Sequence, residues 1–421
     1  MVCGAGWEPA PQDGMDLTYI VVTLVKLAIL FGVLMTTLAY LQWIERKVIA
    51  HIQLRPGPYR VGPHGLLQPL ADVIKLITKE GMIPSHVHKV TYVLAPFLAV
   101  TLALISICVI PFGPRISFTV AGHQISTWLQ MTDLRIGAIF VLAISAVGVY
   151  GVALAGWSSN NKYSLLGGLR SSAQMISYEL PMALALACPL LLANTLSFRD
   201  LVLWQDGYYF GFIPHWNVFQ VFPLQIVAFI LFLIAAFAET NRIPFDLPEA
   251  ENELVAGFHT EYSSMKFASF FMAEYCNMVT VTCVTTLLFL GGWLPLFPAP
   301  WSDYVAPAVF LLAGLVSMWA ALNPARPKDK YTFPVVALAS FGLVVLFLAG
   351  EFVFPIINQI AMPLFWFCAK TGGLLFVWIW VRGTLPRFRY DQLMRFAWTF
   401  MFPVGMVVML ATGAVVALLP R

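Results

Sequence analysis

The chain alternates between long apolar segments and shorter polar connections. A helix rises about 1.5 Å per residue, so crossing a hydrocarbon core of about 30 Å takes about 20 apolar residues. Ten segments of this kind occur, with approximate limits 17–41, 90–111, 134–156, 171–193, 219–238, 267–290, 303–322, 333–354, 362–381 and 396–419. We therefore expect an all-α fold, a polytopic membrane helix bundle of about ten transmembrane helices, formed by residues 1–421 as a single domain.

Basic residues predict how the bundle lies in the membrane, because Lys and Arg are retained in cytoplasmic loops. Of the 24 Lys and Arg, 18 fall in every second connection, which are 42–89, 157–170, 239–266, 323–332 and 382–395. These loops are predicted to be cytoplasmic and both chain ends to lie outside. The first segment contains Lys26 and is followed by no small-residue cleavage site, so we expect it to remain as a helix.

The first cytoplasmic loop, residues 42–89, has two parts. RPGPYRVGPHG, residues 55–65, is dense in Pro and Gly and predicts an extended, non-helical chain. PLADVIKLITKE, residues 69–80, has the period of an amphipathic helix. Its apolar and polar faces are marked by Leu70, Val73, Ile74 and Ile77 and by Asp72, Lys75 and Lys79. We expect this helix to lie on the membrane surface.

Composition supports a membrane protein and restricts its chemistry. The chain is 60% apolar and 11% charged, with a mean hydropathy of +0.81. No GxGxxG fingerprint and no GxxxxGK[ST] loop is present, and the six cysteines lack the close spacing of zinc or iron–sulfur ligands. We expect no metal, no covalently bound cofactor and no nucleic acid, so any electrons must be handled by another protein.

Ionisable residues inside apolar segments are the first candidates for function, since each one at mid-bilayer costs about 2.5–3.5 kcal/mol. Glu179 lies within 171–193, two residues before Pro181, which frees a helix carbonyl. It is a candidate proton-carrying site, and the alternative is a carboxylate paired with a cation that locks two helices together. Glu274 is placed similarly and Glu239 closes a segment. Lys26, Glu351 and Lys370 favour a structural interpretation.

Acidic residues concentrate in ETNRIPFDLPEAENELVAGFHTE, residues 239–261. Asp246, Pro248 and Glu249 have the pattern of a helix start, and Gly257 could end that short helix. Capping does not explain the rest, which are Glu239, Glu251, Glu253 and Glu261. Glu249 and Glu253 are four residues apart, where like charges repel and raise the carboxylate pKa. The alternative is a solvated acidic face.

Glu45, Arg46 and Lys47 follow the first apolar segment. They can be a simple positive anchor at the membrane surface. In the functional alternative, Arg46 turns inward and meets Asp72 on the polar face of the amphipathic helix. The sequence does not decide between these two interpretations.

Four blocks of the sequence closely resemble the H subunit family of bacterial NADH-quinone oxidoreductase, called ND1 in mitochondrial complex I. These blocks are ERKVIAHIQLRPGPYRVGPHGLLQPLADVIKLITKE (45–80), YGVALAGWSSNNKYSLLGGLRSSAQMISYELP (150–181), ETNRIPFDLPEAENELVAGFHTEYSSMKFASFFMAEY (239–275) and TLPRFRYDQLM (384–394). The resemblance implies a subunit between a peripheral arm and a proton-pumping membrane arm, with quinone as substrate and membrane lipid around it. FMN and iron–sulfur clusters would belong to partner subunits.

The resemblance also implies roles for single residues. It places Glu45, Arg46, Asp72 and, more weakly, Lys75, Lys79 and Arg382 near a quinone tunnel. It assigns a chain of carboxylates and its neighbouring loop to Glu179, Glu239, Arg242, Asp246, Glu249, Glu251, Glu253, Glu261 and Glu274. Family members usually have eight spans, so region 300–355 represents a pair of inserted spans whose role the family does not explain.

Three functions are compatible with these features. The favoured one is a membrane subunit of a proton-translocating NADH:quinone oxidoreductase in a bacterial plasma membrane. A related subunit of membrane-bound hydrogenases is the first alternative, and the intact ERK, QLRPGPYRVGP and LQPLAD blocks argue against it. A stand-alone ion transporter would also contain buried carboxylates, but the chain lacks an inverted repeat and has elaborate cytoplasmic loops.

Overall fold

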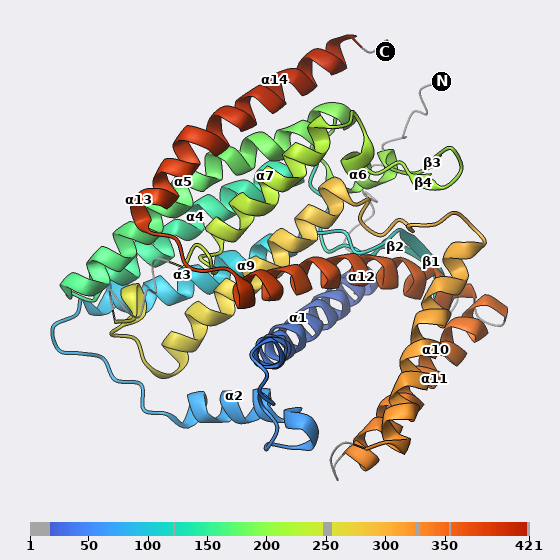
Figure 1. Cartoon of the computed structure of the whole chain (residues 1–421), viewed down its shortest axis with the longest axis horizontal. Coiled ribbons are helices and arrows are strands. Elements are labelled where there is room, and N and C mark those ends of the chain that lie inside the picture. The colour runs from blue at the N-terminus through green and yellow to red at the C-terminus, as the bar shows by residue number, and fades with distance from the viewer. Residues whose placement is uncertain (1–16, 121–122, 247–254, 325–328, 353–354, 419–421) are drawn as a thin grey trace.

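The chain folds into a bundle of long helices with two small β-hairpins (Figure 1). The computed structural model describes residues 17–120, 123–246, 255–324, 329–352 and 355–418. The helices are α1 (Leu17–Ile52), α2 (Gln68–Thr78), α3 (Lys89–Ile107), α4 (Gly137–Ser158), α5 (Lys162–Ala193), α6 (Phe198–Trp204), α7 (Leu224–Glu239), α9 (Ser264–Phe289), α10 (Trp301–Leu322), α11 (Asp329–Phe352), α12 (Pro355–Thr384), α13 (Tyr390–Phe396) and α14 (Phe402–Leu418).

The predicted all-α membrane bundle is confirmed. Among the described helices, nine are long and apolar enough to cross a membrane, with α13 and α14 counted as one span, and α7 is a shorter apolar helix. A π-helical turn, Ala397–Met401, joins α13 to α14 without a break. The α7 helix begins five residues later than expected because Pro223 precedes it and a 3-10 turn occupies Asn217–Phe219.

Small residues let the central helices approach closely. A Cβ added to Gly156 on α4 would lie 2.6 Å from the Ser164 carbonyl oxygen and 3.0 Å from the Gly168 Cα on α5. Contacts of this kind need glycine, and they are the usual way in which membrane helices pack. The core that results brings α3, α4, α5, α7 and α9 together, and the candidate site lies between them.

The amphipathic helix is present as α2, which ends two residues earlier than predicted, at Thr78. Leu70, Val73, Ile74 and Ile77 are all exposed, so its apolar face is turned away from the bundle. The Ser264 hydroxyl at the start of α9 lies 2.9 Å from the carbonyl oxygens of Leu76 and Lys79 and thereby caps the end of α2. The preceding Pro- and Gly-rich loop is not fully extended, since Pro63–Gly65 forms a 3-10 turn.

Two β-hairpins lie in connections where no strand was expected. Strand β1 (Arg115–Val120) pairs antiparallel with β2 (His123–Trp128), and β3 (Tyr208–Tyr209) pairs with β4 (Ile213–Pro214). Lys26 of α1 bonds to the first hairpin: its Nζ donates to Thr127 Oγ1 and to the Trp128 carbonyl oxygen, which is 2.9 Å away. This amine ties α1 to the connection between α3 and α4.

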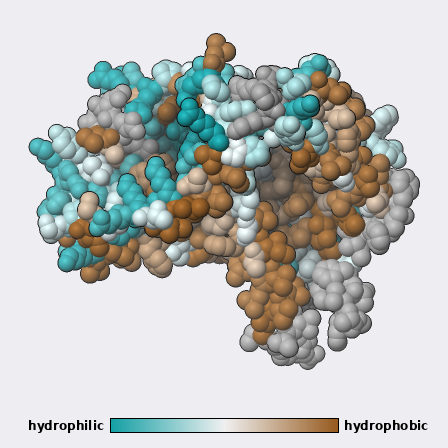
Figure 2. Space-filling model, turned by 90° about the horizontal axis from the view of Figure 1, so that it is seen from below, coloured by the Kyte–Doolittle hydropathy of each residue, from teal (hydrophilic) through white to brown (hydrophobic). Residues whose placement is uncertain are grey.

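Helices α10 and α11 form a hairpin that packs mainly on itself and against α12 (Figure 1). Its far end meets the first loop, where His64 Nε2 lies 2.8 Å from Thr332 Oγ1. The face seen in Figure 2 is hydrophobic over its centre and right and hydrophilic at its left and top, as a protein embedded in lipid requires.

Candidate functional site

Two carboxylates and two guanidinium groups from four segments meet inside the bundle; we call Glu45, Arg242, Glu274 and Arg382 the ion cluster. Arg242 Nε lies 2.9 Å from Glu274 Oε1, and its Nη1 lies 3.5 Å from Glu45 Oε1. Arg382 also pairs with Glu45 Oε1, and the Tyr275 hydroxyl donates to Glu45 Oε2 over 2.9 Å. Breaking a buried pair is costly, so the four side chains are held as a unit.

Arg242 is oriented by the turn that follows α7. The buried Gln174 side chain on α5 donates to the carbonyl oxygens of Ala238 and Phe245, each 2.7 Å away, and so holds both ends of this turn. The Arg242 guanidinium carbon also lies 4.1 Å from the centre of the Tyr275 ring, a favourable cation–π contact. These backbone and aromatic contacts together orient the Arg242 guanidinium group toward Glu45 and Glu274.

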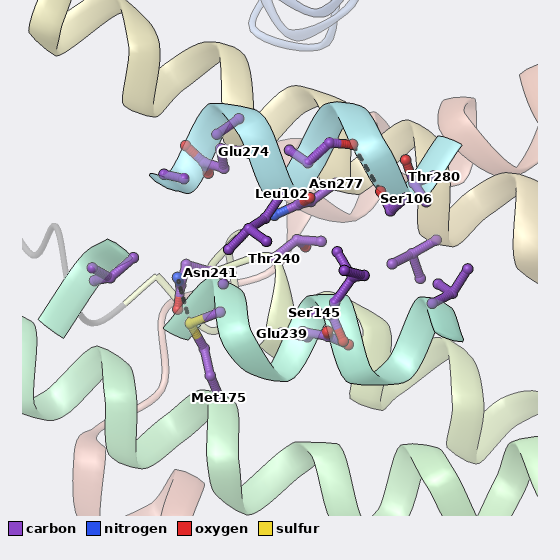
Figure 3. Close-up of a pocket in the computed structure, with 18 of the residues that line it drawn as sticks. Leu102, Ser106, Ser145, Met175, Glu239, Thr240, Asn241, Glu274, Asn277 and Thr280 are labelled. Atoms are coloured by element: carbon purple, nitrogen blue, oxygen red, sulfur yellow. Dashed lines mark hydrogen bonds between the residues drawn. The ribbon is translucent and has the colours of Figure 1, made fainter. Parts of the chain in front are cut away.

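A cavity of about 80 Å³ lies beside the ion cluster, between α3, α4, α7 and α9. Glu274, Asn277 and Thr280 lie on one side of it, and Glu239 and Ser145 lie on the other (Figure 3). Since one water needs about 10–15 Å³ of such volume, the cavity has room for roughly five water molecules.

Several polar atoms in the cavity wall need a partner that the described protein residues do not supply. They are Glu239 Oε2, Thr280 Oγ1 and His259 Nδ1, all buried. Buried polar groups of this kind are normally satisfied by ordered water. The arrangement suits a hydrated passage with a carboxylate at two points, Glu274 of the ion cluster and Glu239 at the opposite wall.

Two described residues of the acidic loop make polar contacts with other segments of the chain. Asp246 pairs with Arg387, with 3.0 Å between Oδ2 and Nη2. Glu261 accepts from Asn161 Nδ2 over 2.8 Å. Glu249, Glu251 and Glu253 lie outside the described residues, as do residues 247–254 of the short helix expected between Asp246 and Gly257. Gly257 itself begins a 3-10 turn, Gly257–His259.

Glu179 does not line the cavity. It lies on α5 next to Tyr178, whose hydroxyl donates to the Leu393 carbonyl oxygen over 2.9 Å. Within the part of the chain that the structure describes, no Lys or Arg nitrogen lies within 4.0 Å of its carboxylate. The expected proton-carrying role of Glu179 stays a prediction.

Arg46 on α1 meets Asp72 on α2, which is the contact that the functional alternative expects. Arg46 Nη1 lies 2.8 Å from Asp72 Oδ2, and Gln68 Nε2 donates to Asp72 Oδ1 over 3.0 Å. Arg46 is 43% exposed. Lys75 lies on the same helix and is exposed.

Comparison with known proteins assigns the chain to a family. The family model described as NADH dehydrogenase matches residues 25–329 and 330–413. The NADH-quinone oxidoreductase H subunit 1 of Solibacter usitatus is 63% identical over 402 residues, which cover 95% of this chain and 98% of that protein. The H subunit 2 of Koribacter versatilis is 46% identical over 96% of this chain and 99% of its own length. The chain belongs to the H subunit family of NADH-quinone oxidoreductase. The resemblance carried by the four sequence blocks is therefore confirmed.

Several residues around the site of this H subunit family member were not anticipated from the sequence. Tyr275 and Arg387 contact the predicted site residues Glu45 and Asp246, Gln174 holds the turn that carries Arg242, and His259 and Thr280 line the cavity. Gln174 gave a usable signal, because an amide within an apolar segment needs a buried partner. Tyr275 and Arg387 gave none, since their acceptors come from segments distant in the chain.

Proposed function

We propose that this chain is the membrane subunit of a proton-translocating NADH:quinone oxidoreductase, where it binds quinone and couples quinone reduction to proton movement. The observation that carries the proposal is the position of Glu274. Its carboxylate pairs with Arg242 of the ion cluster and also lines the cavity. A change of charge in the ion cluster therefore reaches the cavity through one side chain.

The quinone head would bind near Glu45, Arg46, Asp72 and Lys75. Reduction of a quinone by two electrons creates negative charge or takes up protons. In the ion cluster two carboxylates pair with two guanidinium groups. Negative charge on the reduced quinone would attract Arg242 and Arg382 and so weaken their ion pairs with Glu45 and Glu274. The freed carboxylates could then take up protons and pass them by way of cavity water.

The scale of the electrostatics fits such a task. Moving one elementary charge through about 100 mV takes about 2.3 kcal/mol. Losing one partner from a buried ion pair changes the free energy by about 3–5 kcal/mol. Rearranging one contact of Arg242 can thus drive a charge against an ordinary membrane potential.

The loops rich in Lys and Arg, including 42–89 and 239–266, would face the cytoplasm of a bacterial cell, with both chain ends outside. Subunits of the peripheral arm would dock there and carry FMN and the iron–sulfur clusters. Other membrane-arm subunits would receive the protons. Co-purification of this chain with a flavin and iron–sulfur complex is expected, whereas isolation alone would indicate a stand-alone transporter.

The test replaces Glu274 or Glu239 by Gln in the assembled enzyme in vesicles and measures quinone reduction and proton uptake together. We expect each variant to lose most of its coupled activity while the flavin content stays normal. Glu179→Gln tests the third carboxylate in the same assay. Normal coupled turnover in all three variants would refute the relay.

Photo-labelling by a quinone analogue tests the proposed quinone site independently of the proton relay. Label is expected on residues near Arg46 and Asp72. Its absence there, with the relay variants still inactive, would favour the related hydrogenase subunit, which need not bind a quinone.

A further inference from the structure

His259 lies at the cavity wall in the 3-10 turn Gly257–His259, between the acidic loop and α9. It is 7% exposed. The turn is fixed to the bundle through Tyr262, whose hydroxyl lies 3.2 Å from Ser158 Oγ and whose ring stacks on Tyr92 at 4.2 Å. The position of the imidazole is therefore well defined.

One side of the imidazole is covered by aromatic rings. Phe258, Phe267 and Phe271 approach it edge to face, with centroid distances of 5.0, 5.2 and 5.8 Å. These contacts explain why a ring occupies the position. They do not explain why this ring contains nitrogen atoms, because the phenyl ring of Phe would make the same contacts.

The ring nitrogen Nδ1 is buried and has no hydrogen-bond partner among the described residues. Leaving such an atom unpaired is costly, so water in the adjacent cavity is its natural partner. Glu239 and Glu274 are the other titratable residues in the described cavity wall. Of the nearby charged groups outside the wall, Glu261 is bonded to Asn161 and Lys266 lies over the Tyr92 ring.

The imidazole is neutral at ordinary pH, because burial lowers the pKa of His259 to about 4. Neutral imidazole offers one donor and one acceptor nitrogen. It can thus orient water without adding a positive charge next to the two carboxylates.

We infer that His259 is a positioning residue for proton transfer, whose Nδ1 holds a water molecule in the chain that connects Glu274 with Glu239. The inference rests on the proposed function, since it needs protons to cross this cavity. In this inference the Nδ1 atom of His259 binds the water molecule, and the rest of the ring packs against the neighbouring aromatic side chains.

Three substitutions in the assembled enzyme separate these two roles. His259→Phe keeps the ring and removes the nitrogen. His259→Asn and His259→Leu both lose the ring and have the same branched shape and number of side-chain heavy atoms, but Asn keeps a polar atom close to the position of Nδ1. Quinone reduction, its KM for quinone, and proton uptake are measured in vesicles, with the amount of assembled enzyme normalised by flavin content.

We expect His259→Phe and His259→Leu to lower coupled turnover at saturating quinone by about tenfold, as loss of one hydrogen bond in the path would. KM for quinone should stay unchanged, and His259→Asn should restore most of the rate. Normal turnover in His259→Phe, or equal losses in the Asn and Leu variants, would overturn the inference in favour of packing. If Phe fails to assemble, the Asn and Leu pair decides.

The outcome is distinguishable from failure of the proposed function. Loss of coupling in Glu239→Gln together with normal His259→Phe refutes the role of His259 alone. Normal coupling in His259→Phe and in all three Gln variants, at Glu274, Glu239 and Glu179, refutes the relay as well.

Discussion

Arg242 joins two carboxylates that come from helices far apart in the sequence. Its guanidinium group pairs with Glu45 of α1 and Glu274 of α9, and it stacks on Tyr275. Both carboxylates would lose a buried partner if this side chain were shortened. Arg46 offers a contrast, because its pair with Asp72 is close but partly open to solvent.

Arg242→Met is expected to destabilise the protein by about 3–5 kcal/mol, because Glu274 loses its cation and Glu45 keeps only Arg382 as a partner of opposite charge among the described residues. Arg46→Met serves as the matched control and should cost no more than about 1 kcal/mol, since an exposed pair is worth little. The measurement is the thermal midpoint and the yield of assembled enzyme for both variants. Equal losses in the two variants would show that the ion cluster is not a structural unit.

At the residue scale, a site residue can be recognised from the sequence when it is an ionisable residue within an apolar segment. Glu179, Glu239 and Glu274 stand out in this way, and Glu239 and Glu274 share the cavity. Tyr275 and His259 do not stand out, because an aromatic residue or a histidine is ordinary in such a segment. Their roles depend on partners that only the folded chain brings near.

At the scale of elements, helix ends are fixed by side chains from other helices. The Lys370 amine of α12 donates to the carbonyl oxygens of Leu290 and Leu294, each 2.7 Å away, and lies 4.4 Å from the centre of the Trp216 ring. A cation at the C-terminal end of α9 also suits the helix dipole. This amine fixes the C-terminal end of α9, the helix that carries Glu274.

Lys370→Met should lower the thermal midpoint of the assembled enzyme by a few degrees, because each buried carbonyl left unpaired costs about 1–3 kcal/mol. Lys330→Met, at the exposed start of α11, removes the same charge and should have little effect. Thermal unfolding of the purified enzyme compares the two variants. A Lys370 variant as stable as the Lys330 control would contradict the capping role.

The apolar pattern predicts the long helices well, because lipid requires each span to satisfy its own backbone. It does less well in the connections. The strands β3 and β4 have two residues each and pair only with each other, so they leave no alternating pattern to recognise. The start of α7 shifts because Pro223 cannot continue a helix from the residues before it.

For the whole molecule, the α10–α11 hairpin stands apart from the bundle that holds the site. It consists of two antiparallel spans, so the chain returns to the side from which it left. The prediction that region 300–355 is inserted into a core of eight spans is not decided by the fold. It can be tested by removing the hairpin.

Deletion of residues 301–354 should leave the loop before α13 on the same side of the membrane, because an even number of spans is removed. The probe is Arg389→Cys, at a side chain that is 80% exposed. An impermeant thiol reagent should label it in inverted vesicles and not in right-side-out vesicles, with and without the hairpin. Removal of α10 alone is the control and should reverse the labelling.

Labelling from the outer face in the undeleted chain would contradict the orientation predicted from Lys and Arg. The long apolar helices follow from hydropathy, and the side on which each loop lies stays a prediction from the Lys and Arg residues. The meeting of the hairpin with His64 does not, because it depends on tertiary structure.

The bond between Lys26 and the first β-hairpin has a consequence for the order in which the protein is made. Lys26 enters the membrane with the first span, whereas Thr127 and Trp128 are translated about 100 residues later. Until they arrive, the amine must be satisfied by water or lipid head groups at the membrane surface, because an unpaired charge at mid-bilayer would cost about 2.5–3.5 kcal/mol. The bond between α1 and the first β-hairpin can therefore form only after the ribosome has passed beyond α3.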